Sequence, residues 1–586
     1  MIKLLYYYVT LLGNFDEQKT DNSIRTTRRD LSDIFECSGR NVIHLLNKME
    51  EEGWILREKG NGRGNKTRIS FLKTIEEILL DNVQKAISNE ESVNLFRLLE
   101  KYYWLGENAQ GIMVLLFGLN NSDGIQGDSN EESLTFPYFR KLFSLDPIQV
   151  KRQTESHLIR EIFNTLVIYN AKASQYSPNI AHYWERDSLG CNWTFYLRKG
   201  VFFHHGKELT SKDIKFTFER MKGTDFDWIF QSIKSIQCVT DYMIRFTLSK
   251  PQFMWLSILS SFKCAIVPFN YGGKSAKEFQ LKPIGTGPFR VDRHEDDYLM
   301  LKAHTSYFEA RAHLDRINIL FLPTMEKYFT YHQSTENTAD YLPFHLMDSA
   351  ESNYESFEKR NLSIKYLLWN VTKTELDKEE RKKVEEVIDK SLLVKDLGYP
   401  RQETVGFLMG NVETNVPIKT GLNSGSVELT ILAHDLKPDV DDLYYIKERC
   451  EQNGIQIKLV IVPFEDFSKD KYVQKADLIL SEYVLAENDE MGLLSLFMSK
   501  ENTLDKVLPD NYRKEVNVLL EKIWSEKEEE QRRKFFIAIE NILLHNHLVF
   551  PLYSTYQRGF FNQNLLGVNI TNHGLVSFKE LFFRRN

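Results

Sequence analysis

Cysteine is scarce and irregularly placed in this chain of 586 residues. No two of its five cysteines have CxxC spacing; they are Cys37, Cys191, Cys238, Cys264 and Cys450. An odd number of scattered cysteines is typical of a reducing compartment and argues against a cysteine zinc site.

Signals for export and for membrane insertion are also missing. Residues 1–12 have the apolar character of a signal-peptide core, but they contain three consecutive tyrosines, Tyr6 to Tyr8, and no small-residue cleavage site follows. No later stretch reaches the roughly 18 uninterrupted apolar residues of a membrane span. We therefore expect a cytoplasmic protein that does not contact a membrane.

Motifs of common enzyme classes are absent from the sequence. It contains no P-loop, no GxSxG, no HExxH and no GxGxxG after a predicted strand. His204 and His205 are adjacent, so in a strand they point to opposite faces and do not form a metal pair. His545 and His547 share a face only in an extended segment, and no carboxylate or cysteine ligand is obviously placed beside them. We expect no enzymatic activity, no cofactor and no metal.

Charge is unevenly distributed along an otherwise ordinary composition. The chain is 42% hydrophobic and 27% charged, with a net charge of -7, and its length allows about three to five domains. Residues 23–73 carry eleven Lys or Arg against seven Asp or Glu, so this segment is +4 and the remainder is -11. The basic segment is therefore the part suited to a nucleic acid.

The basic segment has the pattern of a helix-turn-helix. Residues 2–12 can form a first helix, and Thr27 to Asp30 form a variant capping box that opens a second helix. Ser38 caps a third helix, whose apolar residues recur at helical spacing; these are Val42, Leu45, Leu46 and Met49. Two short helices joined by a tight turn are typical of DNA-binding domains.

A glycine-rich hairpin follows the third helix. Residues 54–59 and 66–71 alternate as two strands around Gly60 to Asn65. The hairpin carries five basic residues, which are Arg57, Lys59, Arg63, Lys66 and Arg68. A basic hairpin in this place predicts a winged helix that binds double-stranded DNA. The alternative is a small helical domain with a solvated charged hairpin.

The chemistry of each side chain suggests its role on DNA. Arg40 can donate two hydrogen bonds to guanine, Asn41 can recognise adenine, and His44 can reach a base or a phosphate one turn later. Ser38, at the start of the same helix, belongs to the expected DNA-binding set. Basic residues that we expect to contact phosphates, and so to contribute affinity and salt dependence, are Arg28, Lys48, Arg63, Lys66 and Arg68.

Residues 74–133 are predicted to connect this domain to the rest of the chain. The first part, 74–117, is rich in helical patterns and is either a spacer or a dimerisation element of a homodimer. The second part, 118–133, has the Gly, Asn, Ser and Asp bias of a flexible loop. We place a domain boundary there.

The stretch from Asn192 to Met221 shows the pattern of the long C-terminal region. Trp193 to Leu197 alternates as a half-buried strand, and Thr210 with Asp213 marks a helix start. Strands alternate with helices over the following residues as well. This order predicts two α/β lobes joined by crossover strands, with a ligand held between them.

The same stretch is similar to the signature of family 5 extracytoplasmic solute-binding proteins of ABC importers. Further similar segments are Leu145-Asp146-Pro147, Pro283 to Phe289, which resembles the family's GTGPY element, and Pro551-Leu552-Tyr553. The glycines of Pro283 to Phe289 permit close backbone packing or positive φ. The resemblance implies a two-lobed domain like the type II periplasmic binding proteins.

A winged helix followed by such a domain resembles SgrR-type transcription regulators. The similar segments include Leu45 to Met49, Gly62-Arg63-Gly64 and Phe203 to Leu209. Within the last of these, His205 occupies a place where exported relatives usually have Asp. The resemblance implies a cytoplasmic regulator whose DNA affinity responds to a small ligand. The alternative is a solute-binding component of an ABC importer.

We expect a multidomain chain of three parts. These are a winged helix-turn-helix domain at 1–73, a helical connector and linker at 74–133, and a ligand-sensing domain at 134–586. The sensing domain divides into lobe I, at about 134–324 and 485–586, and lobe II, at about 325–484.

The resemblance suggests a sugar or phosphosugar as the ligand. Trp369 and Tyr483 would stack on a ring, Asn370 would bond to a hydroxyl, and Tyr553 would close the cleft. A peptide is the other candidate. Peptide-binding relatives hold the amino terminus with the Asp of a Trp-x-x-Asp segment, whereas this chain has Tyr483 to Ala486 there. Glu487 or Asp489 could replace that Asp.

Overall fold

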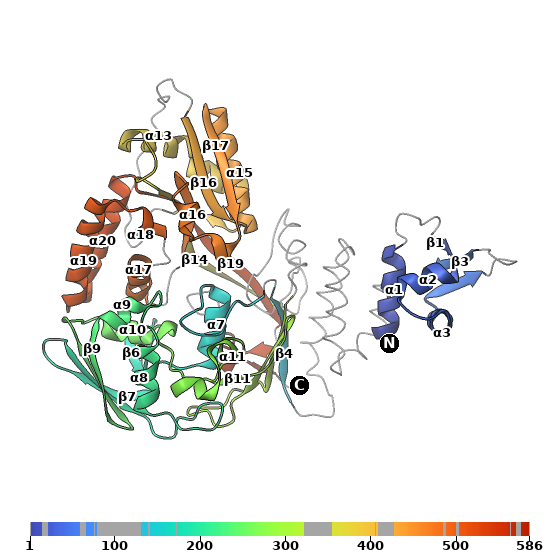
Figure 1. Ribbon diagram of the computed structural model, residues 1–586, viewed down its shortest axis with the longest axis horizontal. Coiled ribbons are helices and arrows are strands. Elements are labelled where there is room, and N and C mark those ends of the chain that lie inside the picture. The colour runs from blue at the N-terminus through green and yellow to red at the C-terminus, as the bar shows by residue number, and fades with distance from the viewer. Residues whose placement is uncertain are drawn as a thin grey trace.

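The fold is that of a computed structural model, which describes most of the chain (Figure 1). The described residues are 2–14, 22–58, 66–74, 77–78, 131–138, 141–171, 173–321, 354–404, 406–407, 427–484, 488–499, 503–562, 564–569 and 576–584. Arg63 and nearly all of the expected connector at 74–133 lie outside these residues.

The N-terminal domain packs three helices against a small sheet. Its elements are α1 (Ile2–Asn14), β1 (Ser23–Thr26), α2 (Arg28–Ile34), α3 (Gly39–Glu51), β2 (Ile55–Glu58) and β3 (Thr67–Phe71). The predicted hairpin is confirmed, since β2 pairs antiparallel with β3 in a register that places Ile55 opposite Phe71. The pattern did not predict β1, which pairs with the other edge of β3 and completes the three-stranded order β1-β3-β2.

The predicted capping box at the start of α2 is present. The Thr27 hydroxyl oxygen accepts from the Asp30 amide at 3.2 Å, and the Asp30 carboxylate accepts from the Thr27 amide at 3.0 Å. Each side chain thus satisfies a backbone donor that the helix itself leaves without a partner. Behind the helices, the Tyr8 ring packs edge-on against Trp54 and Phe71, so α1 is fastened to the sheet.

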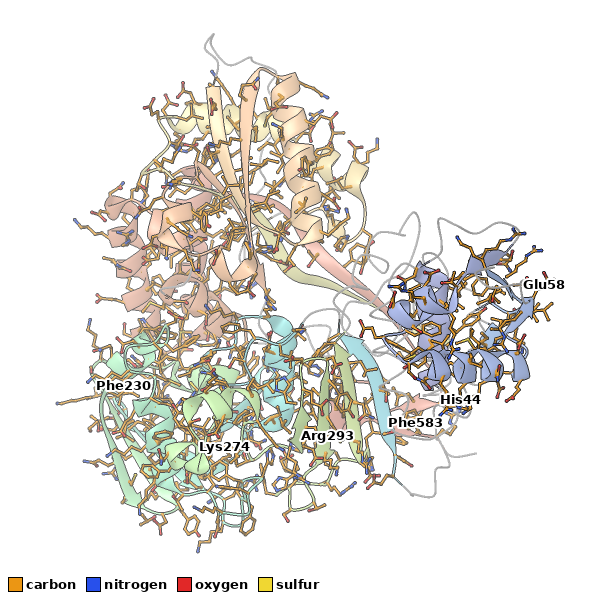
Figure 2. The ribbon with its side chains drawn as sticks, turned by 45° about the vertical axis from the view of Figure 1, so that its right-hand side comes forward. His44, Glu58, Phe230, Lys274, Arg293 and Phe583 are labelled. Carbon is orange, nitrogen blue, oxygen red and sulfur yellow. The ribbon has the colours of Figure 1, made fainter. Side chains whose placement is uncertain are left out.

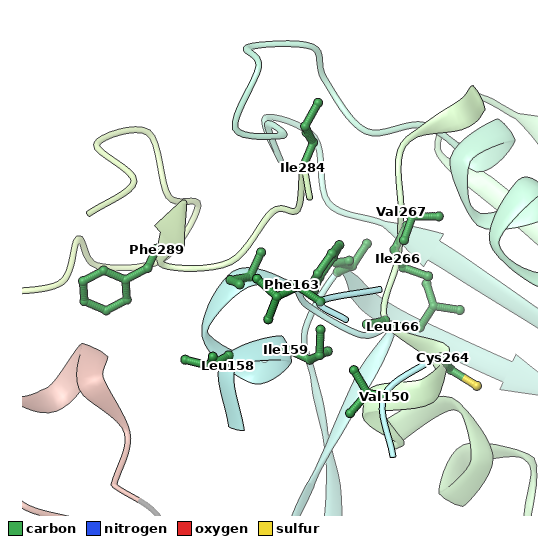
Figure 3. Packing of buried hydrophobic residues seen from close by; sticks show 14 of the residues in the cluster. Val150, Leu158, Ile159, Phe163, Leu166, Cys264, Ile266, Val267, Ile284 and Phe289 are labelled. Carbon is green, nitrogen blue, oxygen red and sulfur yellow. The ribbon is translucent and has the colours of Figure 1, made fainter. Parts of the chain in front are cut away.

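The first lobe contains two four-stranded sheets, β7-β8-β10-β9 and β11-β12-β13-β4. Its strands are β4 (Ser133–Tyr138), β5 (Val167–Asn170), β6 (Gln175–Pro178), β7 (Ala181–Arg186), β8 (Asn192–Leu197), β9 (Ile233–Thr240), β10 (Met243–Leu248), β11 (Phe289–His294), β12 (Tyr298–Ala303), β13 (Arg316–Phe321), β20 (Leu565–Leu566) and β21 (Phe582–Phe583). Its helices are α7 (Gln153–Ile162), α8 (Ser211–Glu219), α9 (Asp227–Gln231), α10 (Trp255–Ser260), η3 (Phe262–Cys264), η4 (Phe269–Gly273), α11 (Ala276–Leu281) and η7 (Phe578–Glu580). The core of this lobe forms around the end of α7, where Phe163 and Leu166 pack near Ile266 and Val267 (Figure 3).

Two glycines of the segment Pro283 to Phe289 lie against the carboxyl end of α7. A β-carbon on Gly285 would lie 2.0 Å from the Ile162 carbonyl oxygen, and one on Gly287 would lie 2.4 Å from the Ile162 carbonyl carbon. Gly287 also donates its amide to that oxygen at 2.8 Å. The predicted close backbone packing is therefore present at both glycines.

The second lobe is built on a six-stranded sheet of order β15-β19-β14-β18-β16-β17. Its strands are β14 (Tyr354–Trp369), β15 (Arg401–Gln402), β16 (Val427–His434), β17 (Ile455–Val462), β18 (Leu478–Val484) and β19 (Val549–Asn562). Its helices are α13 (Lys378–Ile388), α14 (Lys390–Leu397), α15 (Lys437–Gln452), η6 (Phe464–Asp466), α16 (Asp470–Val473), α17 (Asp489–Met498), α18 (Thr503–Val507), α19 (Asp510–Ser525) and α20 (Glu529–His545). In this sheet β16 runs parallel to both β17 and β18, so the carboxyl ends of these three strands share one edge.

The long antiparallel strands β14 and β19 run from the second lobe toward the first (Figure 1). They are the crossover strands that the sequence pattern predicts. The helices between β18 and β19 are expected to belong to lobe I, because the sequence pattern places the lobe boundary at residue 485. Leu493, Leu520 and Leu543 share a hydrophobic cluster with Leu432 and Ile479 of the sheet, so these helices pack with the second lobe.

No helix among the described residues is long and apolar enough to cross a membrane.

The five cysteines are free thiols in the structure.

Candidate functional site

The first candidate site is the outer face of α3. Its apolar residues Val42, Leu45, Leu46 and Met49 are buried, as the spacing predicts. Arg40, His44 and Lys48 are exposed on the other side, and Asn41 is half-buried. Figure 2 shows His44 at the edge of this domain. A polar helix face of this kind beside a sheet is the arrangement with which winged helices enter the major groove.

Two residues of the expected DNA-binding set also hold α3 in place. The Ser38 hydroxyl accepts from the Asn41 amide at 3.4 Å and caps the helix. Arg28, at the start of α2, donates from Nε to the Gly39 carbonyl at 2.9 Å. Both side chains remain exposed, so capping and helix packing do not remove them from the surface.

The basic residues of the hairpin differ in their surroundings. Lys66 is exposed just before β3. Arg68 donates from Nε to the Ser23 hydroxyl at 3.0 Å, and its Nη1 lies 3.9 Å from Glu58. Arg57 is turned toward α3, where it pairs with Glu50. Arg63 lies outside the described residues. Of the hairpin residues that the structure describes, Lys66 is thus the most exposed cation.

The second candidate site is a buried charge network in the second lobe. Lys365 of β14 donates from Nζ to Asp439 at 2.5 Å and to Glu482 at 3.2 Å. The side chains of Lys365 and Asp439 are 3% and 1% exposed, whereas that of Glu482 is 29% exposed. Ser363 donates a short hydrogen bond to Glu482. His434 lies with Nδ1 3.0 Å from Asp439.

Electrostatics favour the charged forms of Lys365 and Glu482. Burial lowers the pKa of Lys365, but the nearby Asp439 and Glu482 carboxylates outweigh burial and raise it above its usual value. For Glu482, burial raises the pKa, but the Lys365 ammonium more than reverses this effect, so the pKa of Glu482 lies below its usual value. A buried ammonium between two carboxylates is thereby compensated.

A second buried pair lies beside the first. Arg401 donates from Nε to Asp442 at 2.7 Å, and the Tyr553 hydroxyl donates to the other oxygen of Asp442 at 2.5 Å. Burial raises the pKa of Asp442 to about 6, against the opposing effect of Arg401. These contacts join β15, α15 and β19, so they stabilise the carboxyl edge of the sheet.

The network lies next to a contact between the lobes. Arg152, which precedes α7 in the first lobe, pairs with Glu465 at 2.5 Å, and its guanidinium lies 5.0 Å from the Phe464 ring centroid. Phe464 in turn lies 5.5 Å from the His434 ring. Ligands of open α/β sheets bind outside the carboxyl ends of the strands. His434 and Glu482 are at those ends, so this edge is the candidate ligand site.

The four residues expected to bind the ligand are all buried inside the second lobe. Trp369 donates to Glu385 at 2.9 Å, and Asn370 donates to the Val473 and Ala476 carbonyls at 3.1 and 3.0 Å. Tyr553 bonds to Asp442, as described above, and Tyr483 packs in the core. In this conformation Trp369, Asn370 and Tyr553 use their polar atoms to hold the sheet and its loops. Their contact with a ligand stays a prediction.

The sequence pattern missed Lys365, His434, Asp439 and Glu482. A Lys or Glu at an alternating position of a strand is usually exposed, and only the pairing of β14 with β18 places Lys365 opposite Glu482. The side chains of Glu487 and Asp489, the alternative partners of a peptide amino terminus, lie outside the described part of the chain.

Of the adjacent histidines His204 and His205 in the first lobe, His204 bonds to the backbone of the glycine segment. Its Nε2 lies 3.1 Å from the Gly287 carbonyl, and its Nδ1 accepts from the Gly285 amide at 3.2 Å. Burial lowers the pKa of His204 to about 3. The neutral ring therefore joins the segment around His205 to the glycine segment. His547 pairs with Glu385 at 2.6 Å rather than with His545.

Comparison with known proteins identifies the class of the fold. Residues 175–505 match the family described as bacterial extracellular solute-binding proteins, family 5 middle. Because this match covers more than half of the chain, the chain belongs to the family 5 solute-binding proteins. Residues 3–106 match the family described as sugar transport-related sRNA regulator N-term, which confirms the resemblance of the N-terminal part to SgrR-type proteins.

Individual relatives are similar to this chain over nearly its full length or share the fold of its larger part. The chain is 25% identical to the uncharacterized protein YhjP of Bacillus subtilis over 100% of both chains. It is 25% identical to the HTH-type transcriptional regulator SgrR of Yersinia pseudotuberculosis, over 99% of this chain and 98% of that one. The periplasmic binding protein DppA of Helicobacter pylori in complex with the peptide STSA is 17% identical, with a TM-score of 0.63 over 78% of this chain and 98% of that one. The last similarity confirms the two-lobed fold.

Proposed function

We propose that the protein is a cytoplasmic transcription regulator that binds double-stranded DNA through α3 and its wing, and that a small solute in the second-lobe edge modulates this binding. The observation that carries the proposal is the exposed polar face of α3, with Arg40 and His44 outward and the apolar residues inward. The similarity to an SgrR regulator supports it, since that similarity extends over 99% of this chain and so spans both its N-terminal and its solute-binding parts.

The DNA contacts follow from the chemistry of the exposed side chains. Arg40, Asn41 and His44 reach base edges or phosphates from the first turns of α3. Arg28, Lys48, Lys66 and Arg68 neutralise phosphates, and Arg63, which lies between β2 and β3 in the sequence, is a further phosphate contact in this proposal. The exposed hydroxyl of Ser38 lies at the start of α3.

The DNA half of the proposal is tested by gel shift on the DNA upstream of the protein's own gene. The double variant Arg40→Ala, Arg63→Ala is compared with the wild type over a range of salt concentrations. We expect weaker binding. The slope of log affinity against log salt concentration should also fall by roughly one or two, because fewer counterions are released when phosphate contacts are lost. Unchanged binding and an unchanged slope would show that these residues do not contact DNA.

The ligand of the sensing domain is a sugar or phosphosugar in this proposal. The Glu482 side chain, which is 29% exposed, offers a carboxylate to hydroxyl groups at the strand ends, and the buried Ser363 hydroxyl and His434 ring lie within the same network. Thermal-shift screening of sugars, phosphosugars, peptides and metals tests this choice, since a ligand at about 100 times its Kd stabilises by about 2.7 kcal/mol. Stabilisation by peptides alone would overturn the sugar assignment.

The second candidate function is solute binding for an ABC importer. The fold similarity to DppA, whose solved complex contains a peptide, favours it. Cell fractionation separates the two functions. A regulator remains with the cytoplasmic fraction and with DNA, whereas recovery of the protein outside the membrane contradicts the regulator.

A further inference from the structure

One side-chain amide on α3 is fixed by a residue of the hairpin formed by β2 and β3. Arg57 of β2 donates from Nη2 to Oδ1 of Asn47 on α3 at 2.5 Å. The same nitrogen pairs closely with a Glu50 oxygen, and the Arg57 backbone amide donates to the other Glu50 oxygen at 2.9 Å. The Arg57 side chain is only 14% exposed. Glu50 therefore anchors Arg57, and Arg57 orients Asn47.

The chemistry of Arg57 determines which way the amide of Asn47 points. A guanidinium carries only donors, so the Asn47 atom that faces it is the oxygen. The amide nitrogen, with its two N–H groups, then points away from Arg57. Rotating the amide by half a turn would bring N–H groups against the guanidinium and break the bond.

Asn47 lies on the face of α3 that is proposed to enter the groove. It is exposed, and it follows Arg40 by seven residues and His44 by three, which places the three side chains on one side of the helix. Recognition of adenine by Asn uses both the amide oxygen and the amide nitrogen, whereas guanine presents two acceptors, N7 and O6. An Asn whose oxygen is already bonded to Arg57 offers donors to the base.

We propose that Asn47, held by Arg57 and Glu50, determines specificity at one position of the DNA site. It selects guanine, which presents two acceptors in the major groove, and discriminates against adenine. The inference rests on the proposed DNA-binding function. Asn41 provides the contrast, because its side chain makes no hydrogen bond within the described part of the chain and is free to present either end.

The test selects bound duplexes from a randomised pool with the full-length protein and sequences them. Wild type is expected to show one position with a guanine preference of about 5- to 100-fold, the range of a good base contact. Asn47→Ala removes the preference at that position alone. Asn41→Ala, the matched control, changes the base preference at a different position of the DNA site and leaves the guanine preference in place.

A second variant tests the orientation itself. Asn47→Asp keeps an oxygen for Arg57 but presents an oxygen outward instead of the N–H groups, so the preferred base is expected to change from guanine to cytosine, whose N4 is a donor. Arg57→Ala frees the amide and is expected to admit adenine. If wild type binds DNA but Asn47→Ala and Asn47→Asp keep its base profile, the inference is wrong. If wild type binds no duplex at all, both the inference and the proposed function fail.

Discussion

The face of α3 and the carboxyl edge of the second lobe use similar residue types in opposite surroundings. On α3, Arg40, His44 and Lys48 are exposed. In the second lobe, Lys365 and Arg401 are buried and each is bonded to a carboxylate. Exposed charges contribute little to folding and remain available to a polyanion. Buried charges are costly unless every one is paired, so removing one partner affects stability strongly.

The largest effect is expected from Lys365→Ala, which leaves the Asp439 and Glu482 carboxylates without their ammonium. The expected loss of stability is about 3–5 kcal/mol, measured by urea unfolding. Lys437→Ala is the matched control, because Lys437 pairs with Asp441 on a more exposed part of α15 and should cost less than about 1 kcal/mol. Equal effects of the two variants would contradict the contrast between buried and exposed charge.

The next largest effect is expected from Gly287→Ala in the first lobe. Its β-carbon would lie 2.5 Å from the Glu161 carbonyl oxygen, and separating the two segments should cost about 2–3 kcal/mol. Gly200→Ala is the control, since Gly200 has a φ of 74° but a β-carbon added there would have no atom within 4 Å. It should lose only the roughly 1–2 kcal/mol of backbone strain. A milder effect at Gly287 than at Gly200 would refute the packing argument.

A pH-dependent effect is expected from Glu161→Gln. Burial raises the pKa of Glu161 from 4.5 to about 7, so between these values the unfolded chain binds fewer protons and stability falls as pH rises. Burial lowers the pKa of the neighbouring His157 from 6.5 to about 4. The unfolded chain therefore binds more protons at His157 between these values, so the contribution of His157 to stability rises with pH over this range.

The two contributions oppose each other in the wild type. Glu161→Gln removes the falling contribution and leaves the rising one. The stability of the variant relative to wild type should therefore increase from pH 4.5 to 7 in unfolding experiments at several pH values. A constant difference between variant and wild type across this range would show that Glu161 titrates as an exposed carboxyl does.

The smallest effect is expected in the N-terminal domain, from Thr27→Ala. Loss of the capping box should cost about 1 kcal/mol, seen as faster amide hydrogen exchange in α2. Ser32→Ala, within the same helix, is the control, because its hydroxyl donates to the Arg28 carbonyl and caps no helix end. Equal exchange in both variants would mean that the cap does not determine where α2 begins.

Local features of the N-terminal domain could be predicted from the sequence because short-range rules determine them. Thr27 and Asp30 form the predicted box, and the buried stripe of α3 is the predicted one. Strand β1 could not be predicted, since Ser23–Thr26 has only four residues and forms by pairing with β3. Likewise, nothing in the spacing shows that Arg57 turns to Asn47 instead of to phosphates.

The candidate ligand site was harder to predict because it depends on contacts between distant segments. Trp369 and Asn370 have the side chains of a sugar site, yet they are covered by α13 and the loop before β18. Lys365 and Asp439 are 74 residues apart and meet only in the folded lobe. Family resemblance supplied the two-lobed fold, but it did not indicate these charged residues.

Coupling between solute and DNA is tested most directly by titrating a labelled duplex, which carries the DNA upstream of the protein's own gene, with the full-length protein. Fluorescence anisotropy gives the Kd with and without a solute that has raised the melting temperature in the thermal-shift screen. Saturating solute should change the Kd by about fivefold or more, the range of an allosteric coupling of about 1–3 kcal/mol. The same Kd in both titrations, with the solute demonstrably bound, would contradict this coupling.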